Sequence, residues 1–152
     1  MGILSDNPSV TLKTSRGIIE IDTKDVIHFP EGILGFEGYN DFAILDITDC
    51  KPFKSMLSVK EGGPDFVVVE PLLIFDDYTP LDSAGPIHDL GLGDPLNLVI
   101  LSIVTLSEKT EDITINLSGP IFLNQATGLA KQVALPDEKY HTKVPVFIDD
   151  EN

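Results

Sequence analysis

The chain has 152 residues and a formal net charge of −15, from 25 acidic and 10 basic side chains. A chain of this length can bury one hydrophobic core unaided, so we predict a single domain, residues 1–152, with its core at about 10–145 and flexible ends at 1–9 and 146–152. The acidity argues against direct binding to nucleic acid or to an anionic membrane, because both attract clustered lysine and arginine.

Strand patterns dominate the first half of the chain. Residues 10–13 and 18–21 are rich in β-branched and apolar side chains and flank a turn-like segment, 14–17, which predicts a β-hairpin. We predict further strands at residues 26–29, 42–45, 53–59 and 66–69.

Residues 27–37, which we call the corner, form a tight turn with unusual backbone requirements at the third predicted strand. One proline in it fixes its own φ, and Gly32 and Gly35 can adopt left-handed backbone angles. We therefore predict an ordered turn whose two ends are anchored in the core by Phe29 and Phe36. The corner carries no nucleophile, metal-ligand cluster or phosphate cradle, so its predicted role is structural.

The strand pattern continues in the second half of the chain. A strand is predicted at 72–75, and the run 96–106 is apolar on both alternating faces. Such a strand is either buried on both sides or bends so that its two halves face different sheets. Residues 113–117 alternate cleanly, and 121–123 with 129–135 form a second predicted hairpin.

Helix signals are weak, because eleven prolines and twelve glycines are spread along the chain. Short helical turns are predicted only around 37–42 and within 81–92. The predicted fold class is all-β and mainly antiparallel: a small β-barrel or sandwich with a long acidic loop and little helix.

That loop is the main candidate for function. From residue 61 to residue 108 there is no lysine or arginine, and residues 76–95 hold five aspartates. Long connections of this kind are often functional, and we expect this one on the surface. Two interpretations stay open: a solvated face that keeps the protein soluble, or a surface that steers a basic partner electrostatically. The candidate partner-binding residues, where acids adjoin aromatic contact area, are Glu70, Phe75, Asp76, Asp77, Tyr78, Asp82 and Asp89.

Signals for catalysis are poor. Asp76 and Asp77 are adjacent, so on an extended chain they point to opposite sides, and the calcium-loop spacing is absent. His88 beside Asp89 keeps a small acidic hydrolase open as an alternative hypothesis, although no nucleophile lies in a G-x-S-x-G context. We predict a protein that is not an enzyme, with no cofactor and no metal.

The expected location is the cytoplasm. The single cysteine, Cys50, precludes an internal disulfide framework and is typical of a reducing compartment. Residues 1–8 lack the basic start and apolar run of a signal peptide, and the longest apolar run, 98–104, is too short to cross a bilayer. No coiled-coil pattern is present, so we expect a monomer.

Several ordered motifs together resemble the bacterial flagellar assembly factor family, FliW. The first is the segment VIHFPEGILGFE at 26–37, followed by DFVVVEP at 65–71 with FDDY at 75–78. The resemblance continues in INLSGPI at 115–121 and residues 124–133, and covers about 10–145. Two places depart from the common pattern: Leu34 stands where proline is frequent, and 127–130 is less basic than usual.

The resemblance implies a small antiparallel β-barrel with a non-enzymatic, protein-binding role. Members of the family bind cytoplasmic flagellin and also the translational repressor CsrA, which binds RNA. It further implies that the factor, once released from flagellin, captures the repressor and relieves repression of flagellin mRNA. A dedicated flagellin chaperone without a repressor partner is the alternative. The acidity of the chain agrees with a basic, RNA-binding partner.

Overall fold

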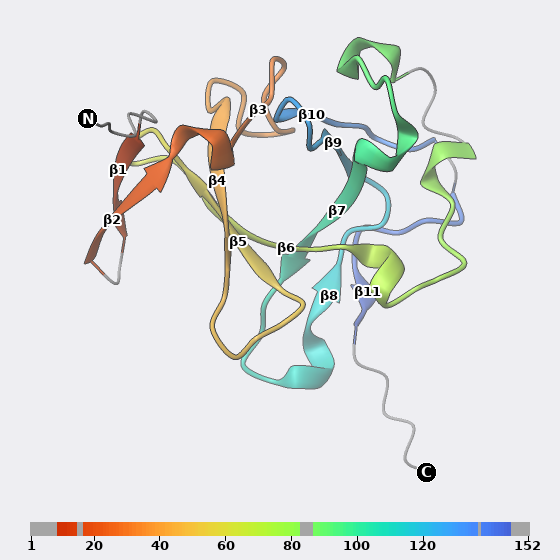
Figure 1. The fold of residues 1–152 in the computed structure, drawn as a ribbon. Coiled ribbons are helices and arrows are strands. Elements are labelled where there is room, and N and C mark those ends of the chain that lie inside the picture. Colours follow the sequence, from red (N-terminus) through yellow and green to blue (C-terminus); the bar gives the residue numbers. More distant parts are fainter. Residues whose placement is uncertain (1–8, 15–16, 83–86, 137, 147–152) are drawn as a thin grey trace.

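The computed structural model describes residues 9–14, 17–82, 87–136 and 138–146 (Figure 1). These residues form eleven strands and six short 3-10 helices, and none of them lies in an α-helix. The strands are β1 (Ser9–Thr14), β2 (Gly17–Asp22), β3 (Val26–His28), β4 (Asp41–Asp46), β5 (Lys54–Ser58), β6 (Asp65–Val69), β7 (Leu98–Thr105), β8 (Thr114–Ile115), β9 (Ile121–Asn124), β10 (Leu129–Gln132) and β11 (Val144–Pro145). The 3-10 helices are η1 (Thr23–Asp25), η2 (Pro71–Leu73), η3 (Pro80–Asp82), η4 (His88–Leu90), η5 (Pro95–Asn97) and η6 (Thr110–Asp112). No helix of the described residues is long and apolar enough to cross a membrane.

Seven of the described strands close into a barrel. Strands β3, β4, β5, β6 and β7 pair antiparallel in chain order. Strand β9 then pairs with β7 and with β10, and a parallel contact between β10 and β3 completes the ring. This closure confirms the all-β, mainly antiparallel class and decides for a barrel over a sandwich. A closed barrel leaves few strand edges exposed.

Strand β7 is shared between two parts of this sheet. Its first half pairs with β9, with Val99 opposite Leu123, and its second half pairs with β6 and with β8. Val104 lies between strand neighbours on both sides, opposite Val67 and Ile115. The two halves therefore have different partners, which explains why the run is apolar on both alternating faces.

Three hydrophobic clusters hold the fold together. The first fills the barrel and includes Phe29, Phe42 and Ile121, each with no exposed surface. The second lies at the other end of β7 and includes Tyr78 and Leu117 together with Val146, one residue beyond the predicted core. Apolar area buried in this way supplies the main driving force for folding.

The third cluster joins the β1–β2 hairpin to the barrel. The hairpin forms its own two-stranded sheet, with Ser9 opposite Asp22 at one end, as predicted. Leu12 and Ile21 are buried against Ala43 of β4. The predicted second hairpin is confirmed as well, since β9 and β10 pair antiparallel.

Two predicted elements are wrong. Residues 72–75 form no strand: η2 begins at Pro71, and the Phe75 amide donates to the Pro71 carbonyl at 2.8 Å. Proline suits the first position of a helical turn because its missing N–H needs no partner there. Around 37–42 the chain makes turns and then enters β4 at Asp41, without a helical turn. Within 81–92 the expected short helical turn is present as η4.

The corner is ordered, but only one of its two aromatic anchors is buried. Gly32 and Gly35 adopt left-handed φ angles of 74° and 87°, and Phe29 is completely buried. Phe36 is 41 % exposed, so the prediction that it is anchored in the core is wrong. Its ring lies edge-on against Phe66, with the ring centroids 5.4 Å apart. The Phe36 ring thus covers Phe66 at the border of the first cluster and is not enclosed within it.

Candidate functional site

The acidic segment, residues 70–95, connects β6 to β7 along one side of the barrel. It leaves β6 through η2, turns at Asp76 and Asp77, and continues through η3, η4 and η5 (Figure 1). In Figure 1 it climbs the right-hand side of the molecule and passes over the top before it enters β7. The described part of this segment lies largely on the surface, as predicted, although Tyr78, Pro80 and Leu90 are buried.

All five candidate carboxylates are exposed, and four of them have no ion pair among the described residues. Glu70, Asp76, Asp77 and Asp82 are all exposed, and no ion pair to any of them occurs within the described residues. Glu70 precedes η2 without capping it through its side chain. Acidic side chains that face solvent in this way can steer a basic partner.

Asp89 is different, because its charge is used within the protein. Its Oδ2 atom lies 3.1 Å from Lys131 Nζ of β10. The hydrogen bond from Lys131 holds the pKa of the Asp89 carboxyl below its ordinary value. Asp89 therefore ties η4 to the barrel, and the structure places it apart from the other four acids.

The two aromatic candidates face the interior. Phe75 is half-buried against the second cluster, and the Tyr78 side chain is only 4 % exposed. The Tyr78 hydroxyl donates a hydrogen bond of 2.6 Å to the Leu117 carbonyl. Burial raises the pKa of the Tyr78 phenol, and the nearby Tyr140 phenol adds to the rise. Tyr78 thus anchors the acidic segment and offers little contact area to a partner.

Further anchors come from distant parts of the chain. The Tyr140 ring stands edge-on to Tyr78 at 4.9 Å, and its hydroxyl accepts a hydrogen bond of 3.2 Å from the Thr79 amide. Asn124 of β9, which is 2 % exposed, donates through Nδ2 to the Leu90 carbonyl at 2.9 Å. These contacts hold both halves of the segment against the barrel, so its carboxylates have a defined position.

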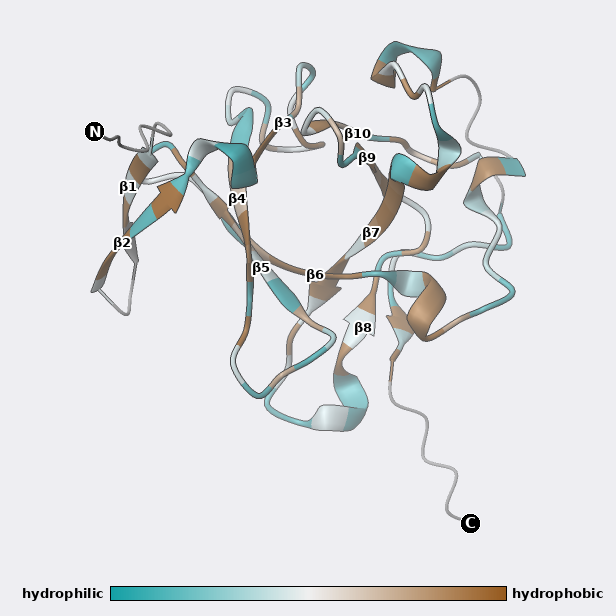
Figure 2. Ribbon diagram, in the orientation of Figure 1, coloured by the Kyte–Doolittle hydropathy of each residue, from teal (hydrophilic) through white to brown (hydrophobic). Residues whose placement is uncertain are grey.

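Two leucines that the sequence interpretation did not select are exposed within this surface. Leu72 is 42 % and Leu73 is 63 % exposed, and both lie on η2 between Glu70 and Asp76. In Figure 2 the η2 coil is brown at the side of the barrel, which marks its apolar character. A strand at 72–75 would have implied that these leucines contribute to the sheet, so their exposure was not expected. Pro71, which favours the start of a helical turn, is the signal that could have indicated it.

The structure gives little support for catalytic chemistry at His88. His88 is exposed, and the carboxylate beside it in the sequence, Asp89, bonds to Lys131. Among the described residues no group of three or more His, Cys, Asp or Glu side chains could hold a metal ion. What the segment does assemble is an acidic surface with an exposed leucine pair. We define the η2 surface as Glu70, Leu72, Leu73, Asp76 and Asp77.

Comparison with known proteins gives a consistent result over nearly the whole chain. The sequence model of the family described as FliW protein matches residues 11–146. The flagellar assembly factor FliW of Leptospira biflexa is 38 % identical over 134 residues, which are 87 % of this chain and 88 % of that protein. The flagellar assembly factor FliW of Clostridium beijerinckii is 33 % identical over 132 residues, 87 % of this chain and 94 % of that protein. A crystal structure of the flagellar assembly factor FliW superposes with a TM-score of 0.77 at 30 % identity, over 94 % of this chain and 99 % of the other.

Proposed function

The chain belongs to the FliW family of flagellar assembly factors, and we propose that it binds cytoplasmic flagellin and, once released, sequesters the translational repressor CsrA. Sequestration relieves repression of flagellin mRNA, so the protein regulates translation without touching RNA and without catalysis. In this proposal a supply of free flagellin keeps the factor occupied, and export of flagellin sets it free.

The observation that carries the repressor half of this proposal is the η2 surface. It combines exposed carboxylates at Glu70, Asp76 and Asp77 with two exposed leucines. An RNA-binding repressor presents basic side chains for phosphate, and the same side chains are attracted to this surface. The leucines supply apolar surface that is buried on binding, whereas the carboxylates raise the rate of association.

Tyr78 has an indirect role in this mechanism. Its buried ring and its hydrogen bond to the Leu117 carbonyl fix the chain immediately after Asp76 and Asp77. A surface that is ordered before binding loses less conformational entropy when the partner arrives. Tyr78 is therefore a positioning residue, and Asp82, further along on η3, extends the field of negative charge.

The electrostatic contribution of the η2 surface to CsrA binding can be tested by reversing the charge of two of its residues. The double variant Asp76→Lys, Asp77→Lys should slow association with purified CsrA by about tenfold or more at low salt, because steering depends on the sign of the surface charge. The difference should shrink as salt rises, since screening shortens the range of the field. Stopped-flow fluorescence over a salt series measures both quantities.

A matched control carries the same charge change elsewhere. Glu111 and Asp112 are adjacent, exposed acids on η6, at the end of the barrel below β8 in Figure 1. The variant Glu111→Lys, Asp112→Lys alters net charge equally and should change the association rate much less. If both variants slowed association equally, the net charge of the protein alone would explain the effect, and the η2 surface would be ruled out as the binding site.

A dedicated flagellin chaperone without a repressor partner remains the second candidate, and the exposure of Leu72 and Leu73 favours it. A chaperone of this kind would bury the leucines against apolar side chains of flagellin, with little dependence on salt. Leu72→Ser with Leu73→Ser should then weaken flagellin binding, while CsrA fails to bind even the unaltered protein. Calorimetric titration with each partner, alone and in competition, separates the two candidates.

A further inference from the structure

The corner between β3 and β4 presents a second apolar surface, apart from η2. Leu34 is 57 % and Phe36 is 41 % exposed, whereas Ile33 of the same turn is buried at 1 %. Large apolar side chains exposed singly are ordinary. These two lie two residues apart on one tight turn, so the turn presents two large apolar side chains to solvent.

The turn holds these side chains outside the core. The Phe36 amide donates to the Ile33 carbonyl at 2.7 Å, and the Leu34 amide donates to Gln132 Oε1 of β10 at 2.9 Å. At Gly32 an added Cβ atom would lie 3.0 Å from Glu37 Cα, so the two limbs of the turn pack backbone against backbone. These contacts fix the backbone that carries the exposed pair.

A line of aromatic rings connects the exposed pair to the barrel core. Phe36 contacts Phe66 at a centroid distance of 5.4 Å, Phe66 contacts Phe42 at 6.0 Å, and Phe42 contacts the fully buried Phe29 at 5.7 Å. The outer and inner pairs, Phe36–Phe66 and Phe29–Phe42, are edge-to-face, and such pairs stabilise one another beyond their buried area. Phe36 is therefore held in place before any partner binds, which lowers the ordering cost of binding.

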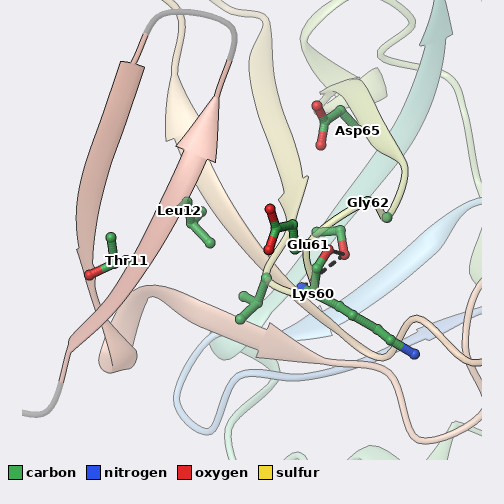
Figure 3. Close-up of a pocket in the computed structure, with 9 residues that line it drawn as sticks. Thr11, Leu12, Lys60, Glu61, Gly62 and Asp65 are labelled. Atoms are coloured by element: carbon green, nitrogen blue, oxygen red, sulfur yellow. Dashed lines mark hydrogen bonds between the residues drawn. The ribbon is translucent and has the colours of Figure 1, made fainter.

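A hollow of about 320 Å³ adjoins the corner, between β1 and the turn that joins β5 to β6 (Figure 3). Tyr39, two residues beyond the corner, packs against two residues that line it: Lys60 Nζ lies 5.2 Å from the centroid of the Tyr39 ring, and an added Cβ at Gly63 would meet that ring at 2.8 Å. The volume is sufficient for one long side chain of a partner. The Tyr39 amide donates to the Phe36 carbonyl at 3.2 Å, so one residue connects the wall of the hollow to the apolar pair.

The charge of the hollow selects the occupant. Glu61 and Asp65 line it, and Figure 3 shows the Lys60 side chain turned away from them. Glu37 adds a carboxylate on the corner itself. A second copy of this chain, with its net charge of −15, is repelled from such a surface, as is an anionic membrane. A cationic protein segment is attracted.

We propose that the corner and the adjoining hollow form a second protein-docking surface, which takes a partner segment with apolar side chains against Leu34 and Phe36 and a lysine or arginine side chain in the hollow beside Glu61 and Asp65. The surface is separate from η2 and does not depend on the function proposed above. It allows the protein to hold two partners, one at each surface.

The test uses a fluorescein-labelled amphipathic peptide of leucine and lysine as the probe. Fluorescence anisotropy should show binding to the full chain, and a peptide with glutamate in place of lysine should not bind. Leu34→Ser with Phe36→Ser should raise the Kd about tenfold or more, given the apolar area that these side chains bury. Leu96→Ser with Leu106→Ser is the matched control, because both leucines are exposed and lie outside both proposed surfaces, and it should leave the Kd within about twofold.

Two single variants test whether the charged side chains that line the hollow contribute to peptide binding. Asp65→Asn should weaken binding of the leucine–lysine peptide, and Lys60→Ser, which removes the cation beside the hollow, should strengthen it. Phe36→Ser could weaken binding by disturbing the fold. The single variant Leu34→Ser avoids this, since Leu34 is the more exposed of the two side chains, and it should also weaken binding. The proposal is overturned if the unaltered protein does not bind the peptide, if both double variants weaken binding equally, or if phosphatidylcholine vesicles bind in place of the peptide.

Discussion

The corner and the acidic segment both present apolar side chains beside carboxylates, but they are held in place in different ways. The corner is held mainly by contacts close in sequence: the Phe29 amide donates to the Asn40 carbonyl, and the Asn40 side chain donates back to the Phe29 carbonyl. A long-range hydrogen bond, from the Leu34 amide to Gln132, adds to them. The acidic segment is held by residues far along the chain, such as the Leu117 carbonyl, which accepts from Tyr78. A surface can thus be built by local turns or by long-range anchors, and the second kind depends on the whole fold.

This difference has a consequence for mutations. Changes at Leu117, Asn124 or Tyr140 act on the acidic segment from a distance, because each bonds to it or packs against it. The corner responds mainly to changes within itself, in the line of aromatic rings that packs against it, and at Gln132, which bonds to the Leu34 amide. Four predictions follow from the comparison and are ordered by the size of the expected effect.

Phe29→Ala should give the largest loss. Phe29 is fully buried at the inner end of the ring line, and replacing a buried phenylalanine with alanine typically lowers the free energy of unfolding by about 3–5 kcal/mol. Urea unfolding measures the loss. Leu34→Ala on the same corner, being largely exposed, should stay within about 0.5 kcal/mol; a comparable loss there would mean that the corner is packed more tightly than its exposure indicates.

Tyr78→Phe should cost less, about 1–3 kcal/mol, because it leaves the buried Leu117 carbonyl without its donor. The pH dependence identifies the cause. The folded-state pKa of the phenol is raised above its unfolded value, so its stabilisation is complete below about pH 10 and is lost as the pH rises toward the folded-state value. The difference in unfolding free energy between the unaltered protein and the variant should therefore shrink in alkaline solution. A constant difference would assign the loss to packing alone.

Gly32→Ala and Gly35→Ala separate two causes of strain in the corner. Both glycines have left-handed φ angles, which cost any other residue about 1–2 kcal/mol. Only at Gly32 would the new Cβ press on backbone, 3.0 Å from Glu37 Cα, while Gly35 faces open space. Gly32→Ala should therefore lower the thermal unfolding midpoint further. Equal shifts would show that the close approach at Gly32 relaxes without cost.

Asp89→Asn should have the smallest effect on stability. The Asp89–Lys131 ion pair is partly exposed, with 49 % and 24 % of the two side chains accessible, so its loss should cost about 0.2–1 kcal/mol. Salt should reduce that cost further. Amide hydrogen exchange at His88 and Leu90 would detect looser docking of η4 even where global stability is unchanged. Unaltered exchange would leave Asn124 as the main anchor of this turn.

The sequence was sufficient for the parts of the molecule whose structure is local. The hairpins at β1–β2 and β9–β10 and the left-handed glycines of the corner follow from spacing within short windows. For the apolar run of β7 the sequence left two alternatives open, and the structure shows that its two halves pair with different strands. The strand expected at 72–75 failed because apolar runs suit strands and short helical turns alike, and only Pro71 distinguished them. The same ambiguity concealed the exposure of Leu72 and Leu73.

The position of the acidic segment was decided by tertiary structure. Its composition established that it is charged, and most of its carboxylates are exposed. Whether Tyr78 faced solvent or the core depended on Leu117 and Tyr140, which lie 39 and 62 residues further along the chain. Local propensity carries no information about contacts at that separation, because such contacts form only when the barrel closes and brings the segments together. The sequence by itself therefore determined the all-β class, the acidity and the turns, whereas closure of the barrel determined which side chains of the acidic segment reach a partner.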